Sequence, residues 1–219
     1  MFHVKHSPAL PDWLHSTEAA LSAYVDLLST TGVEHGLIGP REVPRLWERH
    51  VLNCAVVADP ALDLVPAGAR VADVGSGAGL PGLVWGIART DIQVVLIEPL
   101  LRRATFLTQA VDNLGLADRV SVLRGRAEDI AALPDWEPVD VVTARAVAPL
   151  EKLLGWTVPL LVHGGKLALL KGSSATEEIA TAAPVALSMG VSGLGITTCG
   201  SPWVDPETTV VTGTRGTAQ

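Results

Sequence analysis

Two hydrophobic patterns divide the chain at about residue 66. Before it, from about residue 8 to residue 60, apolar side chains recur with the spacing of amphipathic helices, and residues 32–40 separate two such segments. The side chains expected on their buried faces are Leu21, Tyr24, Val25 and Leu28 in the first segment, and Val43, Leu46, Trp47, His50, Val51 and Cys54 in the second. The pattern predicts an N-terminal helical extension over residues 1–65 and a second unit over residues 66–219, together one compact body.

Short β-branched runs alternate with helical stretches after residue 66. The predicted strands are 70–74, 93–97, 120–123, 139–143 and 166–170, and the helical stretches between them are 80–89, 102–114 and 150–161. This alternation predicts an α/β fold, a parallel sheet with helices on both faces, whose ligands bind at the carboxyl ends of the strands. A helical stretch broken or kinked near Pro184 should follow, and two closely spaced strands, 193–199 and 208–213, should form a terminal antiparallel pair.

Composition is typical of a globular protein. The 219 residues are 48% hydrophobic, enough to bury a sizeable core. No stretch approaches the roughly 18 apolar residues of a membrane span, and no apolar run follows the first residues, so we expect a cytoplasmic protein without a membrane partner. The two cysteines, Cys54 and Cys199, and the six histidines lack metal-ligand spacing, which predicts buried free thiols and no metal site.

A glycine-rich turn follows the first predicted strand and includes Gly75, Gly77, Gly79 and Leu80. Glycines permit a tight turn with close ligand approach, and the helix start that follows offers free N–H groups, so the turn suits a nucleotide-type ligand. The same run contains the G-x-G-x-x-G pattern of dinucleotide sites, which leaves NAD as an alternative. Asp73 at the strand end would repel a pyrophosphate but tolerates the cationic sulfonium of S-adenosylmethionine, which favours the latter.

Three further residues follow the second and third predicted strands. Glu98 lies 23 residues after Gly75, the first glycine of the turn, and suits ribose hydroxyls, although both cofactors would use it. Ala127 and Glu128 lie where a methyltransferase receives the adenine ring and its amine. The alternative for Glu128 is that it begins a short solvated helical turn.

The segment after the fourth predicted strand, residues 142–149, indicates the type of methyl acceptor. It has neither the Asn/Asp-Pro-Pro-aromatic motif of exocyclic-amine methylation nor the cysteine used on pyrimidine carbon, and it offers Arg145 instead. An acceptor with a free lone pair, such as guanine N7, needs no general base, so positioning can supply most of the rate. We therefore assign Arg145 to positioning, through guanine O6 or phosphate.

The net charge of −7 argues, taken alone, against a nucleic-acid partner. The distribution of charge changes this interpretation, because basic residues follow three predicted strands at the ligand-binding edge: Arg124, Arg126, Arg145 and Lys171. Others could extend this face over an RNA: His3, Lys5, His6, Arg41, Arg45, Arg49 and His50. The alternative for the extension is a solvated helix face on which glutamates 42 and 48 pair with the neighbouring arginines.

Several of these segments together resemble the RsmG (GidB) family of bacterial 16S rRNA guanine-N7 methyltransferases. The matching segments are 46–53, 73–83, Glu98 with 102–107, 126–128, 143–146 and 169–172. The resemblance implies a Rossmann-like seven-stranded sheet with an antiparallel last strand, S-adenosylmethionine as cofactor, and a guanosine of the decoding region of 16S rRNA, in the small ribosomal subunit, as acceptor. It also associates loss of the protein with low-level streptomycin resistance.

The resemblance also implies roles for individual residues. Cofactor contact is implied for Gly75, Leu80, Ala127, Glu128 and Arg145, with Glu98 at the ribose, and RNA contact is implied for Arg126 and Lys171. The chain departs from the family at positions 53 and 54, where Asn53 and Cys54 stand in place of Asp and Ser. An ionic role at position 53 is therefore in doubt.

Three other functions are compatible with parts of the sequence. An NAD-dependent oxidoreductase would use the overlapping dinucleotide pattern and would bind NADH. A non-catalytic RNA-binding protein would retain a vestigial pocket, although the intact Asp73, glycine turn, Glu98 and Glu128 argue against decay. A methyltransferase acting on another acceptor, a protein side chain or a metabolite, would keep the same cofactor residues.

Overall fold

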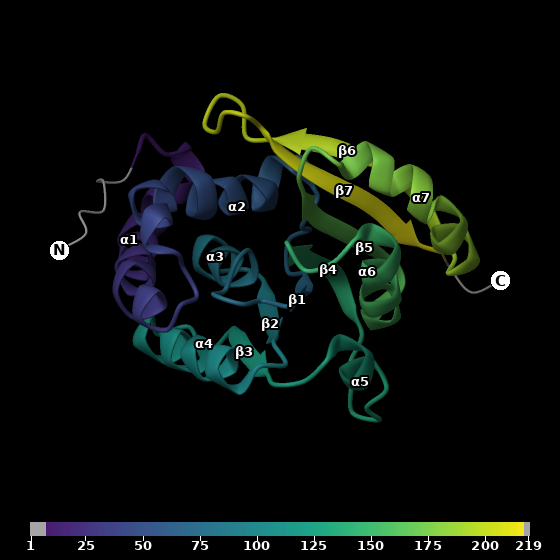
Figure 1. Cartoon of the computed structure of the whole chain (residues 1–219), viewed down its shortest axis with the longest axis horizontal. Coiled ribbons are helices and arrows are strands. Elements are labelled where there is room, and N and C mark those ends of the chain that lie inside the picture. Colours follow the sequence, from purple (N-terminus) through teal and green to yellow (C-terminus); the bar gives the residue numbers. More distant parts are fainter. Residues whose placement is uncertain (1–7, 217–219) are drawn as a thin grey trace.

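The computed structural model describes residues 8–216 and contains a seven-stranded sheet in the order β3-β2-β1-β4-β5-β7-β6 (Figure 1). Its strands are β1 (Arg70–Val74), β2 (Gln93–Ile97), β3 (Val120–Leu123), β4 (Val139–Arg145), β5 (Leu161–Lys171), β6 (Val191–Cys199) and β7 (Thr208–Arg215). The five strands β3, β2, β1, β4 and β5 pair in parallel in that order, whereas β7 is antiparallel to β5 and β6. The predicted sheet is confirmed, and its strand order reverses between β1 and β4, where sheets of this type bind ligands.

Helices cover both faces of the sheet and belong to two separate hydrophobic clusters. One cluster contains residues of α1 (Glu18–Leu27), α2 (Asn53–Ala55), α3 (Gly82–Ala88) and α4 (Leu101–Asn113), and the other contains residues of α5 (Ala127–Ala131), α6 (Leu150–Thr157) and α7 (Ala175–Ser188). Shorter 3-10 or π-helical segments are Asp12–Thr17, Leu28–Gly32, Pro40–Arg45, Leu46–Leu52, Val56–Ala58, Pro60–Leu62 and Val158–Leu160. No helix within residues 8–216 is both long and apolar enough to span a membrane.

The N-terminal extension packs on α3. Of the side chains expected on its buried faces, all are buried except His50, which is half-buried. Trp85 in the middle of α3 donates its indole N–H to the carbonyl oxygen of Cys54 at 2.8 Å. The extension therefore shares one hydrophobic cluster with α3 and α4, and it reaches the carboxyl end of the sheet where the glycine turn lies.

The structure differs from several predicted elements. Of the two alternatives predicted at Pro184, the break was wrong, because α7 continues through this exposed residue while Ala182 and Ala186 on its other face are buried against the sheet. The last two strands form the predicted antiparallel pair, but β7 lies between β5 and β6. Both cysteines are free and buried, as predicted.

Candidate functional site

The glycine turn has a backbone that only glycine adopts readily. Gly75, Gly77 and Gly79 have φ values of 69°, 58° and 99°. The N–H of Gly75 donates to the carbonyl oxygen of Ile97 at 2.8 Å, which joins the turn to the end of β2. Leu80 is half-buried in the same turn, and α3 begins two residues later, at Gly82, instead of at the predicted residue 80.

Asp73 lies fully buried beneath this turn. Its Oδ2 accepts the N–H of Gly82 at 3.0 Å, and a Cβ at position 82 would lie 2.5 Å from the Asp73 Cβ. Its Oδ1 has no hydrogen-bond partner among the described residues. Burial raises the pKa of this carboxyl to about 7, while the Gly82 N–H lowers it. Asp73 thus fixes the first turn of α3 and leaves one buried acceptor available.

Replacing Asp73 with Asn should change how stability depends on pH. The folded-state pKa is raised from 3.8 to about 7, so the stability that the protonated carboxyl contributes is lost as pH rises through about 7. Between pH 5 and pH 8 the wild type should therefore lose about 2 kcal/mol relative to Asp73→Asn. Urea unfolding of both proteins at the two pH values measures this difference. If both proteins lost the same free energy of unfolding, the pKa of the buried Asp73 carboxyl would not be raised.

Glu98 joins the ends of β1 and β2. Its side chain is buried, Oε2 accepts the N–H of Gly77 at 2.9 Å, and Oε1 accepts the N–H of Leu100 at 3.0 Å. Each carboxylate oxygen retains a further lone pair. The carboxylate is therefore held rigidly beside the glycine turn, at the position where the sequence predicts contact with a ribose.

Tyr24 is a site residue that the sequence pattern placed only on a buried helix face. Its hydroxyl donates to the carbonyl oxygen of Ala78 at 2.6 Å, and a Cβ at Gly79 would lie 2.9 Å from that hydroxyl. A buried tyrosine hydroxyl requires a hydrogen-bond partner, which is the signal that could have drawn attention to it. Through this bond the N-terminal extension supports the glycine turn directly.

The residues after β3 lead into the short helix α5, which begins at Ala127. Ala127 is buried, whereas Arg126 and Glu128 are exposed and form an ion pair of 3.9 Å. Arg124 is also exposed. Both interpretations of Glu128, a solvated helical turn and an adenine contact, are compatible with this placement.

Arg145 at the end of β4 is held by the N-terminal extension. Its Nη1 donates to Sγ of Cys54 at 3.0 Å, and its Nη2 contacts the carbonyl oxygen of Arg49 and Nδ1 of His50, both at 3.2 Å. The backbone turns sharply after it, because Ala146 has a φ of 56°. Val147 then lies against the glycine turn, 2.9 Å from where a Cβ at Gly75 would be. Three of the predicted site residues, Arg49, His50 and Arg145, therefore meet.

Lys171 at the end of β5 is engaged inside the protein. Its Nζ donates to the carboxylate of Glu178 at 2.6 Å and to the carbonyl oxygen of Ala148 at 2.7 Å, and its side chain is 9% exposed. Glu178 also accepts the N–H of Leu150, the first residue of α6. As it stands, this lysine connects β5, α6 and α7, and contact with RNA would require the ion pair to open.

Replacing Lys171 with Ala should lower the free energy of unfolding by about 1–2 kcal/mol, because it removes the cation from a partly buried carboxylate that keeps only its bonds from the Leu150 N–H and the Ser174 hydroxyl. The double variant Lys171→Ala/Glu178→Ala should recover at least half of that loss. Urea unfolding of the two single variants and the double variant measures the coupling. Additive losses would show that the two side chains do not depend on each other.

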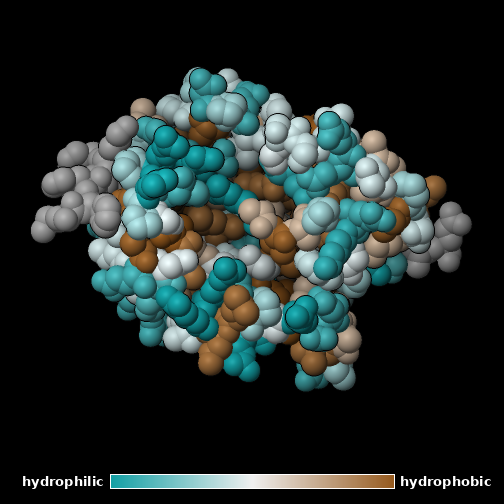
Figure 2. All heavy atoms as spheres, viewed as in Figure 1, coloured by the Kyte–Doolittle hydropathy of each residue, from teal (hydrophilic) through white to brown (hydrophobic). Residues whose placement is uncertain are grey.

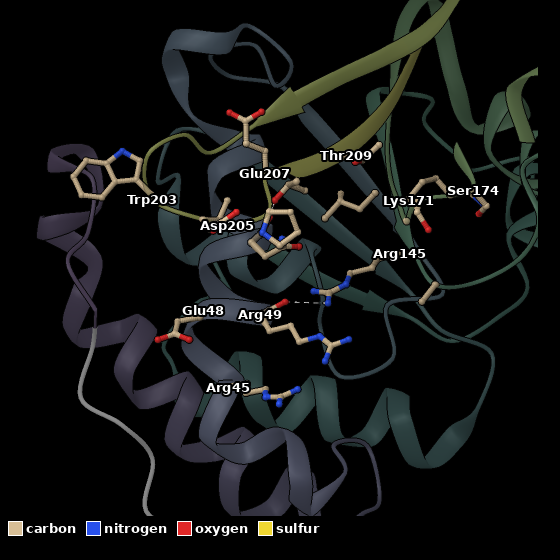
Figure 3. Close-up of a pocket in the computed structure, with 18 of the residues that line it drawn as sticks. Arg45, Glu48, Arg49, Arg145, Lys171, Ser174, Trp203, Asp205, Glu207 and Thr209 are labelled. Carbon is tan, nitrogen blue, oxygen red and sulfur yellow. Dashed lines mark hydrogen bonds between the residues drawn. The ribbon is translucent and has the colours of Figure 1, made fainter. Parts of the chain in front are cut away.

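A cleft of about 1590 Å³ opens beside the glycine turn, between the N-terminal extension, the loop after β4, the end of β5 and the loop between β6 and β7 (Figure 3). Its charged and aromatic lining residues include Arg45, Glu48, Arg49, Arg145, Lys171, Glu178, Trp203, Asp205 and Glu207. The glycines of the turn do not line it, and Val147, which packs against Gly75, is a residue that both regions share. Figure 2 shows this face of the molecule hollowed near its centre, with hydrophilic residues gathered over α2.

The basic residues of the extension differ in whether they form ion pairs. Arg49 lies 3.7 Å from Glu42, as the solvated-face alternative expects, whereas Arg45 and Glu48 form no ion pair within residues 8–216. His3, Lys5 and His6 lie outside the described residues. Within the described part of the chain, no group of three or more His, Cys, Asp or Glu side chains is arranged to hold a metal ion.

Comparison with known proteins connects this geometry to one family. The family model described as rRNA small subunit methyltransferase G matches residues 17–206. The protein of that name from Mycolicibacterium gilvum is 51% identical over 199 residues, which are 91% of this chain and 85% of the relative. The one from Salinispora tropica is 54% identical over 192 residues, 86% and 78% of the two chains.

Solved structures share the fold. A predicted O-methyltransferase from Agrobacterium tumefaciens has a TM-score of 0.54 at 26% identity, covering 76% of this chain and 80% of its own. The O-methyltransferase from Bacillus cereus in complex with SAH has a TM-score of 0.59 at 13% identity, covering 90% of each chain. The sheet described above is therefore that of S-adenosylmethionine-dependent methyltransferases.

Proposed function

The chain belongs to the rRNA small subunit methyltransferase G family, and from this we propose that it transfers the methyl group of S-adenosylmethionine to N7 of a guanosine in the decoding region of 16S rRNA. The proposal makes the small ribosomal subunit or its rRNA the partner and places the reaction in the cytoplasm. The observation that carries it is the hydrogen bond between Glu98 and the glycine turn, which follows β1, one of the two strands between which the strand order reverses.

The residues at this junction fit the proposed cofactor. The lone pairs that Glu98 retains can accept ribose hydroxyls, and the glycines, which lack a Cβ, let a ligand approach the backbone of the turn closely. The unpaired buried oxygen of Asp73 suits a cationic ligand better than a pyrophosphate. We propose that Ala127 and Glu128 receive the adenine ring. When bound, S-adenosylmethionine supplies the electrophilic methyl group.

The loop after β4, which lies between the glycine turn and the cleft, fits an acceptor whose attacking atom carries no proton. Residues 145–149 offer one guanidinium and four apolar side chains, with no base. Guanine N7 has a free lone pair at neutral pH, so correct placement of the purine suffices for in-line attack. We propose that Arg145 holds guanine O6 through donors that the extension leaves free, and that Arg45, Arg49 and Arg126 contact phosphates.

Small subunits from a strain that lacks this modification provide the test. With labelled S-adenosylmethionine and the purified protein, the label should appear in 7-methylguanosine after digestion of the rRNA to nucleosides. Label in another nucleoside or in ribosomal protein would identify a different acceptor. Cofactor binding without transfer to subunits, free 16S rRNA or assembly intermediates would favour a non-catalytic RNA-binding protein.

A further inference from the structure

Within residues 8–216, the N-terminal extension supplies every hydrogen bond that holds the Arg145 guanidinium. The acceptors are Sγ of Cys54 and the carbonyl oxygen and ring Nδ1 of two consecutive residues, Arg49 and His50, more than ninety residues away in sequence. These bonds use both N–H groups of Nη2 and one of Nη1. The Nε–H and the second N–H of Nη1 have no partner among the described residues, so a substrate can receive both.

The tautomer of His50 follows from these contacts. Arginine has only donors, so Nδ1 of His50 must carry the lone pair that accepts from Arg145. The remaining proton is then on Nε2, which lies 3.0 Å from Oε2 of Glu42 and donates to it. The imidazole is 15% exposed, so it is fixed from both sides in its neutral form. Glu42, His50 and Arg145 form a directed chain of hydrogen bonds from the extension to the end of β4.

We propose that His50 is a positioning residue for methyl transfer: its unprotonated Nδ1 holds Arg145 in the orientation that places the acceptor purine. The inference rests on the proposed function, because it assigns Arg145 to that purine. Arg145 lines the cleft two residues before Val147, which packs against the glycine turn, so a rotation of its guanidinium would displace a purine that it holds. Misplacement of about 1 Å can reduce a rate by about 100-fold.

Protonation of His50 would break this arrangement. An imidazolium would present an N–H donor and a positive charge to a guanidinium that already carries both. The charged groups that face His50 are Glu42, Arg49 and Arg145, and burial lowers the pKa of His50 below its usual 6.5, with the two arginines adding to the effect and Glu42 opposing it. Methyl transfer should therefore be independent of pH near neutrality and should fall on acidification, at a pH below 6.5.

Replacing His50 with asparagine or with glutamine tests the two ring nitrogens separately. Asparagine places an oxygen close to where Nδ1 lies, whereas glutamine reaches only towards Nε2. His50→Asn should retain a methyl-transfer rate within about threefold of the wild type at pH 7.5. Its rate should no longer decrease on acidification. His50→Gln and His50→Ala should lower kcat by about 100-fold at every pH while the Kd for S-adenosylmethionine changes less than threefold. Activity of His50→Asn as low as that of His50→Ala, or an unchanged decrease on acidification in His50→Asn, would overturn the proposal.

A spectroscopic measurement separates this inference from the proposed function. In ¹⁵N-histidine spectra at pH 7.5, the ring signals that disappear in His50→Asn should show a protonated Nε2 and an unprotonated Nδ1, and Arg145→Ala should shift the Nδ1 signal. Those signals do not depend on what the chain methylates. A protonated Nδ1, or a signal unmoved by Arg145→Ala, would remove the contact on which the inference depends even if 7-methylguanosine is formed.

Discussion

Glu98→Ala should weaken the binding of S-adenosylmethionine by at least about 100-fold. The substitution removes the proposed acceptor of the ribose hydroxyls and leaves the N–H groups of Gly77 and Leu100 without a partner. Hydrogen bonds to a charged group contribute about 1.5–3 kcal/mol each, so the loss of two corresponds to roughly two to four factors of ten. Calorimetric titration with S-adenosylmethionine and S-adenosylhomocysteine measures the effect.

Two variants make that result specific. Glu177→Ala removes an exposed carboxylate of α7 far from the turn and should bind the cofactor as the wild type does. Glu98→Gln keeps the size of the side chain but turns an amide N–H₂ towards one of two backbone donors, so its affinity should be intermediate. A folded Glu98→Ala that binds within threefold of the wild type would show that the cofactor lies elsewhere.

Arg145→Ala should lower methyl transfer by about 1000-fold, because the removal of one preorganised donor at a reacting centre commonly costs about 10²–10³ in rate. Arg145→Lys should recover little of this. A lysine ammonium cannot satisfy Cys54, Arg49 and His50 together and still offer two fixed donors to a purine. Single-turnover transfer to small subunits measures the loss.

Arg126→Ala is the matched control for that prediction. Its side chain is exposed, and the ion pair that it forms with Glu128 is long at 3.9 Å. If Arg126 contacts a phosphate, its loss should weaken RNA binding. The slope of the logarithm of the binding constant against the logarithm of the salt concentration should become about one unit less steep, and the single-turnover rate at saturating RNA should be nearly unchanged. A loss in cofactor affinity alone, equal in Arg145→Ala and Arg126→Ala, would contradict the assignment of Arg145 to the acceptor.

Local chemistry made the sheet and the turn predictable. The β-branched runs of β1 to β4 are compatible with few structures other than strands, and the glycines after β1 with few other than a tight turn. The antiparallel last strand follows from two closely spaced β-branched runs near the end of the chain. Pro184 was misleading because the cost of a proline inside a helix is met by packing, here of Ala182 and Ala186, which a local pattern does not contain.

Contacts between distant segments were not predictable. Tyr24 meets Ala78 across 54 residues, and Arg145 meets His50 across 95, so both depend on how the extension lies over the sheet. Lys171 could be placed at the sheet edge from its strand, but its exposure is decided by Glu178, which reaches it only because α7 begins early, at Ala175. The sequence therefore predicted the form of the glycine turn better than the contacts that the N-terminal extension makes with the turn and with the end of β4.

Methylation at N7 of one guanosine of small-subunit rRNA can be detected by chain cleavage. Guanine methylated at N7 loses its base after borohydride reduction, and aniline then cleaves the RNA chain at that nucleotide. Subunits treated with the wild-type protein and S-adenosylmethionine should show one new cleavage, at a guanosine of the decoding region, which is absent after treatment with Glu98→Ala or Arg145→Ala. Transfer of labelled methyl groups to the subunits without any such cleavage would contradict methylation at N7.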